Sequence, residues 1–195
     1  MSAKINGYRE ETLKGLTTGA AVAFEDFDLA TDTYKTGKKM GTTSGGVKVT
    51  IEYPDAWDRE LDGVPANSVG MRENEFMRPT VALTLAEVSN TSTLKRALSG
   101  ATVGAAVKPT GYQVVKPVND VRTEDYLENI TLFTQTKGTK DPLIIVLERP
   151  LSTEGFEFAT EAKAGGVIEV TFTGNYDPAN LDEVPIKFYV PAPSV

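Results

Sequence analysis

The chain has 195 residues, of which 40% are hydrophobic and 24% charged, and its net charge is -7. Such a chain can bury a sizeable core, and we expect a single domain, since all-β domains often reach this length. The sequence contains no cysteine and no histidine. Disulfides, thiolate and imidazole metal sites and Ser–His catalysis are therefore excluded. The acidic net charge also opposes adhesion to nucleic-acid phosphates.

The hydropathy of the chain predicts no membrane segment. Residues 1–14 carry charges of both signs, unlike a secretory signal, and form a possible N-terminal arm. The longest strongly apolar run, Leu143 to Leu147, is far shorter than the ~20 residues that span a bilayer. We therefore expect no membrane insertion, and we expect residues 191–195 to form a frayed C-terminal tail.

Alternation of apolar and polar residues, which is typical of half-buried strands, occurs in four segments. These segments are 47–53, 81–86, 168–173 and 186–190. Further strands are expected near 17–24, 112–118 and 155–160. Many short strands with little helix predict a mainly β fold, either a two-sheet sandwich or a barrel-like arrangement.

Residues 54–79 lie between the first two alternating segments and show neither strand nor helix periodicity. A structureless loop of this length is usually functional or disordered. Its apolar side chains would gain from burial against a partner, which argues against pure disorder. We predict a partner surface here, although packing of Trp57 on its own domain is an equal alternative. The candidate contacts are Trp57, Val64, Val69, Met71, Phe76 and Met77.

One short helix is predicted in the stretch NTSTLKRALSG. Thr91 or Ser92 can cap its free N–H groups, and Gly100 suits the left-handed residue that ends a helix. Leu94 and Leu98 lie four residues apart and therefore share one face. We expect this short helix to pack on a sheet edge.

The run from Leu143 to Leu147 does not alternate, and it follows a strand-like segment and the turn-rich residues 137–142. A hairpin that pairs 128–135 with 143–149 is the natural arrangement. An apolar run of this kind is either a central strand covered on both faces or a strand with one face against another subunit. The candidate residues for that subunit interface are Ile144, Ile145 and Val146.

Three patterns suggest chemistry but fail its requirements. The stretch GTTSGGVK differs from a phosphate-binding loop because Val47 precedes Lys48, so we predict a tight turn that feeds a strand. The stretch DPANLDEV lacks the alternating oxygen ligands of a calcium loop, and we predict a turn there. No pattern places an acidic pair such as Glu154 and Glu157 across a cleft. We predict no catalytic residue, no metal site and no cofactor.

Four stretches carry a resemblance to one family. They are GTTSGGVKV at 41–49, NTSTLKRALSG at 90–100, the segment from Leu143 to Pro178, and LDEVPIKFYVP at 181–191. Over roughly residues 15–191 the chain resembles the major tail tube protein of long, non-contractile-tailed (siphovirus-type) bacteriophages.

This resemblance implies a β-sandwich with a flanking helix. It also implies that six subunits close a ring, that the inner sheets of the ring join into a β-barrel, and that rings stack into a hollow tube for genome delivery. Residues 54–79 would then be the loop between rings. The implied partners are further copies of the chain, the tail tape measure, tail tip and tail terminator proteins, and genomic DNA in transit without specific binding. The implied location is the virion, and the host cytoplasm during assembly.

A conduit for DNA must hold a polyanion without gripping it, since even a few lysine–phosphate contacts confer substantial affinity. Glu52 and Glu169 lie on polar strand faces and are the candidate lumen residues, with ordinary surface acids as the alternative. Other functions remain open: a tube protein of a phage-like contractile or secretion particle, a monomeric carbohydrate-binding β-sandwich, or a carboxylate hydrolase. A sugar binder would present several exposed aromatics, whereas the chain has one tryptophan.

Overall fold

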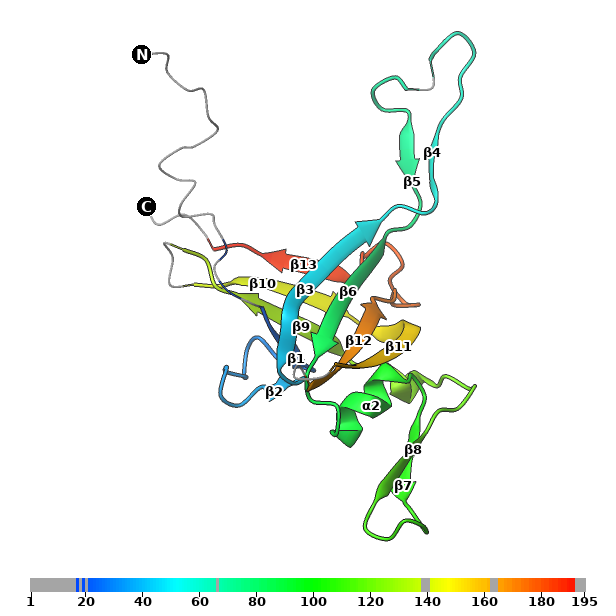
Figure 1. Ribbon diagram of the computed structural model, residues 1–195. Coiled ribbons are helices and arrows are strands. Elements are labelled where there is room, and N and C mark those ends of the chain that lie inside the picture. The colour runs from blue at the N-terminus through cyan, green and yellow to red at the C-terminus, as the bar shows by residue number, and fades with distance from the viewer. Residues whose placement is uncertain are drawn as a thin grey trace.

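The computed structural model describes residues 17, 19, 21–65, 67–137, 141–161 and 165–191. Within these residues lie two main antiparallel sheets, two small two-stranded sheets and one short α-helix (Figure 1). No closed barrel occurs in the described ranges. The mainly β, sandwich-like fold predicted from the sequence is therefore confirmed.

The larger sheet has five strands in the order β13-β10-β9-β1-β2. Their bounds are β13 Ile186–Tyr189, β10 Leu143–Glu148, β9 Asn129–Thr134, β1 Val22–Glu25 and β2 Lys38–Lys39. The predicted hairpin is confirmed, because β9 pairs antiparallel with β10, with Ile130 opposite Leu147. The strand expected near 17–24 begins later, at Val22.

The second sheet has four strands in the order β11-β12-β6-β3. Their bounds are β11 Leu151–Glu161, β12 Gly165–Thr173, β6 Arg78–Leu85 and β3 Thr43–Glu52. Gly45 and Gly46 have φ values of 79° and 94° and lie where the pairing of β3 with β6 shifts register. The tight turn predicted in GTTSGGVK is therefore wrong: the glycines form a bulge within β3, since left-handed glycine is what such a bulge requires.

The core lies between the two sheets and contains the apolar side of each alternating strand. Val81, Leu83 and Leu85 of β6 are at most 2% exposed. Ile130, Leu132 and Leu147 contribute from the five-stranded sheet, and Ile168, Val170 and Phe172 from β12. Burying each large side chain contributes roughly 1.5–3 kcal/mol to folding. This shared core makes the two sheets one packed body.

A second, aromatic cluster covers the opposite face of the five-stranded sheet. Phe24, Phe27 and Phe133 meet edge to face with ring centroids 5.0–5.4 Å apart, and Ile144 packs against them. Ile145 packs instead against the main core. The apolar run of β10 thus has both faces covered within the subunit, which confirms one of the two arrangements predicted for it.

Helix α2 (Thr91–Ala97) packs on edge strand β11, as predicted, and the Ser152 hydroxyl donates a hydrogen bond of 3.0 Å to the Ala97 carbonyl. The predicted cap is wrong by one residue: the Asn90 side chain accepts from the Ser92 backbone N–H. Asn90 has the extended backbone of an N-cap, so the oxygen of its side-chain amide reaches the first turn of the helix. The predicted helix end is late by one residue: Leu98 is the C-cap and Ser99, with φ +29°, is the left-handed residue after it, while Gly100, with φ +76°, lies one residue further along.

A buried charge cluster ties α2 to the five-stranded sheet. The carboxylate of Glu25 is 2% exposed and pairs with Arg96 of α2 and with Lys38 of β2. Burial lowers the pKa of the Arg96 guanidinium, although arginine stays charged in proteins. Because a buried carboxylate is costly without a partner, these contacts hold the helix in place.

Two hairpins project from opposite ends of this body (Figure 1). The first, formed by β4 (Ala56–Asp58) and β5 (Arg72–Asn74), continues the line of β3 and β6 and is called the arm, residues 53–77. The second is formed by β7 (Thr102–Ala105) and β8 (Gln113–Lys116) and leads to the 3₁₀ turn η1 (Thr123–Asp125). The expectation of a structureless segment at 54–79 is wrong, because three-residue strands are too short to show periodicity.

Candidate assembly surfaces

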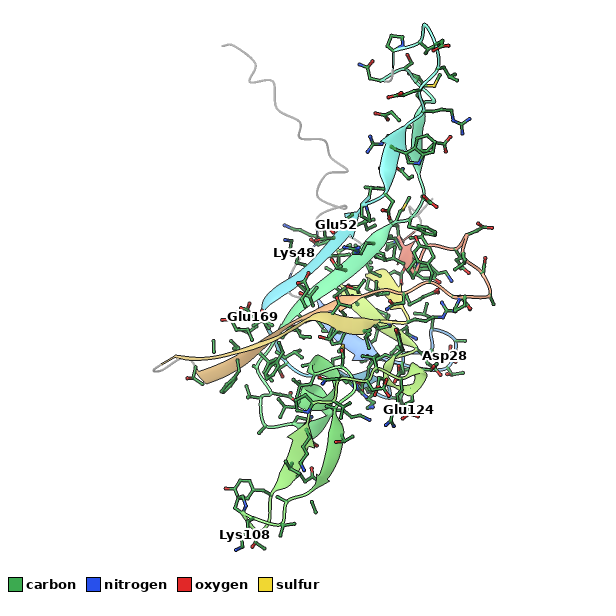
Figure 2. The ribbon with its side chains drawn as sticks, turned by 90° about the vertical axis from the view of Figure 1, so that its right-hand side faces the viewer. Asp28, Lys48, Glu52, Lys108, Glu124 and Glu169 are labelled. Atoms are coloured by element: carbon green, nitrogen blue, oxygen red, sulfur yellow. The ribbon has the colours of Figure 1, made fainter. Side chains whose placement is uncertain are left out.

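The outer face of the four-stranded sheet is polar and carries both candidate lumen residues. Glu52 on β3 and Glu169 on β12 are exposed, and Figure 2 shows them on the same side of the molecule. Small side chains lie between them, since Glu169 pairs in register with Thr84 of β6. The structure thus brings the two predicted residues onto one face, and their role as a channel lining stays a prediction.

This face is less acidic than the carboxylates alone suggest. Lys48 projects from it on β3, and Arg78 is the register partner of Glu52. Glu157 of β11 is the register partner of Glu169, which adds a third acid. The two cations thus share the face with three carboxylates. The net charge of these five residues is -1.

Within the described residues, each outer strand of the four-stranded sheet has a strand partner on one side alone. There β3, with 10 residues, pairs only with β6, and β11, with 11 residues, pairs only with β12 and contacts α2 near its start through Ser152. Residues 153–160 of β11 are all exposed. Long free edges present unsatisfied backbone donors and acceptors and are templates for pairing with another chain. Lys48 on β3 has the charge opposite to that of Glu157 on β11, whereas Glu52 at the end of β3 has the same charge as Glu157.

At the β11 edge, the apolar face of the four-stranded sheet extends beyond the area that the opposing sheet covers. Phe156 and Phe158 are the register partners of Val170 and Ile168, so all four side chains lie on the core side. Val170 and Ile168 are at most 3% exposed, whereas Phe156 is 36% and Phe158 52% exposed. Sequence reasoning missed these two phenylalanines, because their spacing in 155–160 predicts an ordinary strand with a buried face.

The arm holds the residues predicted for contacts between rings. Trp57 is 50% exposed and Val69 is fully exposed. Val64 and Phe76 are also exposed, while Met71 and Met77 are half-buried. Tyr176 fixes the base of the arm, because its hydroxyl accepts a 2.9 Å hydrogen bond from the Met77 backbone N–H. The six predicted residues thus lie on one projecting element.

The predicted interface strand lies inside the five-stranded sheet, between β9 and β13. Val146 is buried and the side chains of Ile144 and Ile145 are half-buried. Little of this strand's apolar surface is left for another subunit, and its contact with one stays a prediction. One edge of this sheet is β13, where Phe188 is 49% exposed.

The depression beside η1 is lined in part by paired charges. Hydrogen bonds from Lys187 to Glu148 and Glu183 raise the pKa of Lys187 and lower that of Glu183. Arg149 pairs with Asp177 at 2.5 Å. These contacts tie the turn predicted at 177–184 to β10 and β13. The charged side chains therefore have a role in holding the fold together.

Among the described residues, no group of three acidic side chains could hold a metal ion. No helix in the same ranges is long and apolar enough to cross a membrane. The surfaces that stand out are therefore the two sheet edges, the outer face between them and the two projecting hairpins.

No protein-family model matches the chain, and no curated protein sequence matches it.

Proposed function

We propose that this protein is a structural subunit whose copies join edge to edge into closed rings and stack into a tube, as tail tube proteins of long-tailed phages do. The observation that carries the proposal is the four-stranded sheet, whose two long outer strands, β3 and β11, pair with no further strand in the described part of the chain. A contact between two different edges is heterologous, and such contacts generate rings when the rotation closes. Closure satisfies both edges of the four-stranded sheet at once.

The exposed phenylalanines support the same arrangement. A neighbouring β3 added beside β11 would place its core-side residues, Val47 and Val49, next to Phe156 and Phe158. Adding a strand to a free edge combines backbone hydrogen bonds with side-chain contacts. The apolar layer would then run continuously from one copy to the next. A ring of six copies is the number that the family resemblance implies.

The outer face of the sheet would line the channel of such a ring. Its small hydroxyl and methyl groups, and its two cations balanced by nearby acids, offer little net attraction to a polyanion. Under this proposal the protein resides in the virion, acts with tape measure, tip and terminator proteins, and performs no catalysis.

The test is a matched pair of edge substitutions examined by sedimentation and negative-stain microscopy. Phe158→Asp and Phe188→Asp change side chains of nearly equal exposure, 52% and 49%, on edge strands of different sheets. We expect wild type and Phe188→Asp to form rings or tubes and Phe158→Asp to remain monomeric yet folded. A wild-type protein that stays monomeric at millimolar concentration, even with tail initiation proteins present, contradicts the proposal.

A further inference from the structure

The arm has more carboxylates than its own arginines can neutralise. Residues 53–77 contain six carboxylates and two arginines, a net charge of -4. Both arginines pair across the arm, Arg59 with Glu73 at 2.6 Å and Arg72 with Asp58 at 3.4 Å. The other four acids form no ion pair with any described residue. They are Asp55, Glu60, Asp62 and Glu75.

The β7–β8 hairpin has the opposite charge. Residues 101–117 contain Lys108 and Lys116 and no carboxylate. Neither lysine forms an ion pair within the described residues, and Lys108 lies at the far end of the hairpin (Figure 2). Of the acids that follow in sequence, Asp120 and Glu124 share one arginine, Arg122, and the Asp125 carboxylate accepts a hydrogen bond from the Arg122 backbone N–H. The hairpin itself, residues 101–117, has a net charge of +2.

Both elements also expose apolar surface at their tips. Val107 and Tyr112 of the hairpin are 89% and 66% exposed. On the arm, Leu61 and Val69 are 51% exposed and fully exposed. Apolar groups of this size gain from burial when a complementary surface is available. Charge and apolar exposure thus coincide at both projections.

The two projections lie at opposite ends of the molecule in views 90° apart (Figures 1 and 2). One copy therefore cannot bring its own arm to its own hairpin. A second copy in the same orientation, displaced along the long axis of the molecule, presents its positive end to the negative end of the first.

We propose that the arm of one copy docks on the β7–β8 hairpin of the next copy along the tube, and that their opposite charges set the direction of stacking. This inference rests on the proposed function, since it assigns the contact between successive rings. Exposed ion pairs are individually weak and are screened by salt. Their main effect is on orientation, because an inverted copy would oppose arm to arm or hairpin to hairpin and bring like charges together.

Cross-linking tests the contact directly, because the native chain has no cysteine. Asn67→Cys in the arm and Thr110→Cys in the hairpin are made in separate preparations, mixed, and treated with a short bismaleimide. In the control mixture, the arm variant is combined with Ala30→Cys, which lies on an exposed loop of the body. We expect the arm–hairpin mixture to give a heterodimer product well above the control mixture and above either variant alone.

The outcomes separate this inference from the proposed function. Rings or tubes without arm–hairpin cross-links above the control overturn the docking contact and leave ring closure intact. Arm–hairpin cross-links in protein that forms open stacks without rings support the docking contact and overturn ring closure. Monomeric protein with only background cross-linking overturns both.

Charge reversal tests the electrostatic part. In Lys108→Glu/Lys116→Glu we expect the protein concentration needed for tubes to rise about tenfold, as the loss of a few exposed pairs implies. Lys35→Glu/Lys39→Glu makes the same change in net charge on the body and serves as the control. Adding Glu60→Lys/Asp62→Lys to the hairpin variant should restore stacking. Equal stacking by the hairpin variant and its control, or no restoration, overturns the role of charge.

Discussion

The body and the arm use similar apolar residues in opposite ways. In the body, Val81, Leu83 and Phe172 are at most 2% exposed within a shared core. In the arm, which continues β3 and β6, Trp57 is 50% exposed and Val69 is fully exposed. The arm is held by three paired residues on each strand and by surface ion pairs. Stability is therefore concentrated in the body, while the arm exposes apolar side chains beyond its base, where Phe76 packs edge to face on Tyr176.

The largest expected effect tests the body. Phe172→Ala should destabilise the fold by about 3–5 kcal/mol, because it removes a fully buried ring from the core. Phe158→Ala is the matched control on the next strand and should cost less than about 1 kcal/mol, since its ring is half exposed. Urea unfolding of both monomers measures the difference. Similar losses would mean that the β11 edge belongs to the core.

The buried charge cluster gives the next largest effect. Arg96→Met leaves Glu25 with Lys38 alone, and we expect a loss of about 2–3 kcal/mol, below the usual cost of breaking a buried pair because one partner remains. The Lys38 side chain is 60% exposed, so Lys38→Met should lower the free energy of unfolding distinctly less than Arg96→Met does. Thermal unfolding of the two variants at neutral pH gives the order, and a reversed order would contradict the assigned roles.

Removing the arm should change stability much less. Replacement of residues 56–74 by a short Gly/Ser linker keeps the Tyr176 contact with Met77 and should alter unfolding by less than about 1 kcal/mol. We expect such a variant to form rings that do not stack. Hydrogen exchange adds a second measurement: the arm should exchange rapidly in the monomer and become protected in tubes. Strong protection in the monomer would place the arm with the body instead.

The smallest effect on stability is expected on the outer face of the four-stranded sheet. Glu52→Lys/Glu169→Lys changes two exposed side chains, so unfolding should shift by less than about 0.5 kcal/mol. The same change adds positive charge where DNA would pass and should slow ejection from assembled particles. Ejection kinetics at several salt concentrations provide the measurement. Normal kinetics would remove both residues from the channel lining.

Sequence periodicity predicted the strands with one buried face, and it failed where both faces are exposed. β6 and β12 alternate over most of their length because the core covers one side. β4 and β5 have three residues each and, within the described part of the chain, lie outside both core clusters, so no pattern marks them. β11 extends beyond the predicted 155–160, because a bulge with Gly155 at φ +74° interrupts its pairing with β12.

The candidate surfaces were only partly predictable for a related reason. Alternation predicts that Glu52 and Glu169 lie on polar strand faces, but only sheet pairing shows that the two faces are the same one. The exposure of Phe158 depends on where the opposing sheet ends, which no local pattern records. The contact of Glu25 with Arg96 likewise joins segments that are distant in sequence.

The interrupted pairing at the root of the arm has a mechanical consequence. The ladder between β3 and β6 ends at Glu52 opposite Arg78, and the ladder of the arm begins at Ala56 opposite Asn74. Between them, the backbone of residues 53–55 has no cross-strand partner in either ladder. In a stack joined through arms, bending would concentrate at these junctions, where few hydrogen bonds oppose it. Each wall could then stay rigid while the column as a whole curves, so that stiffness and flexibility occupy different parts of one chain.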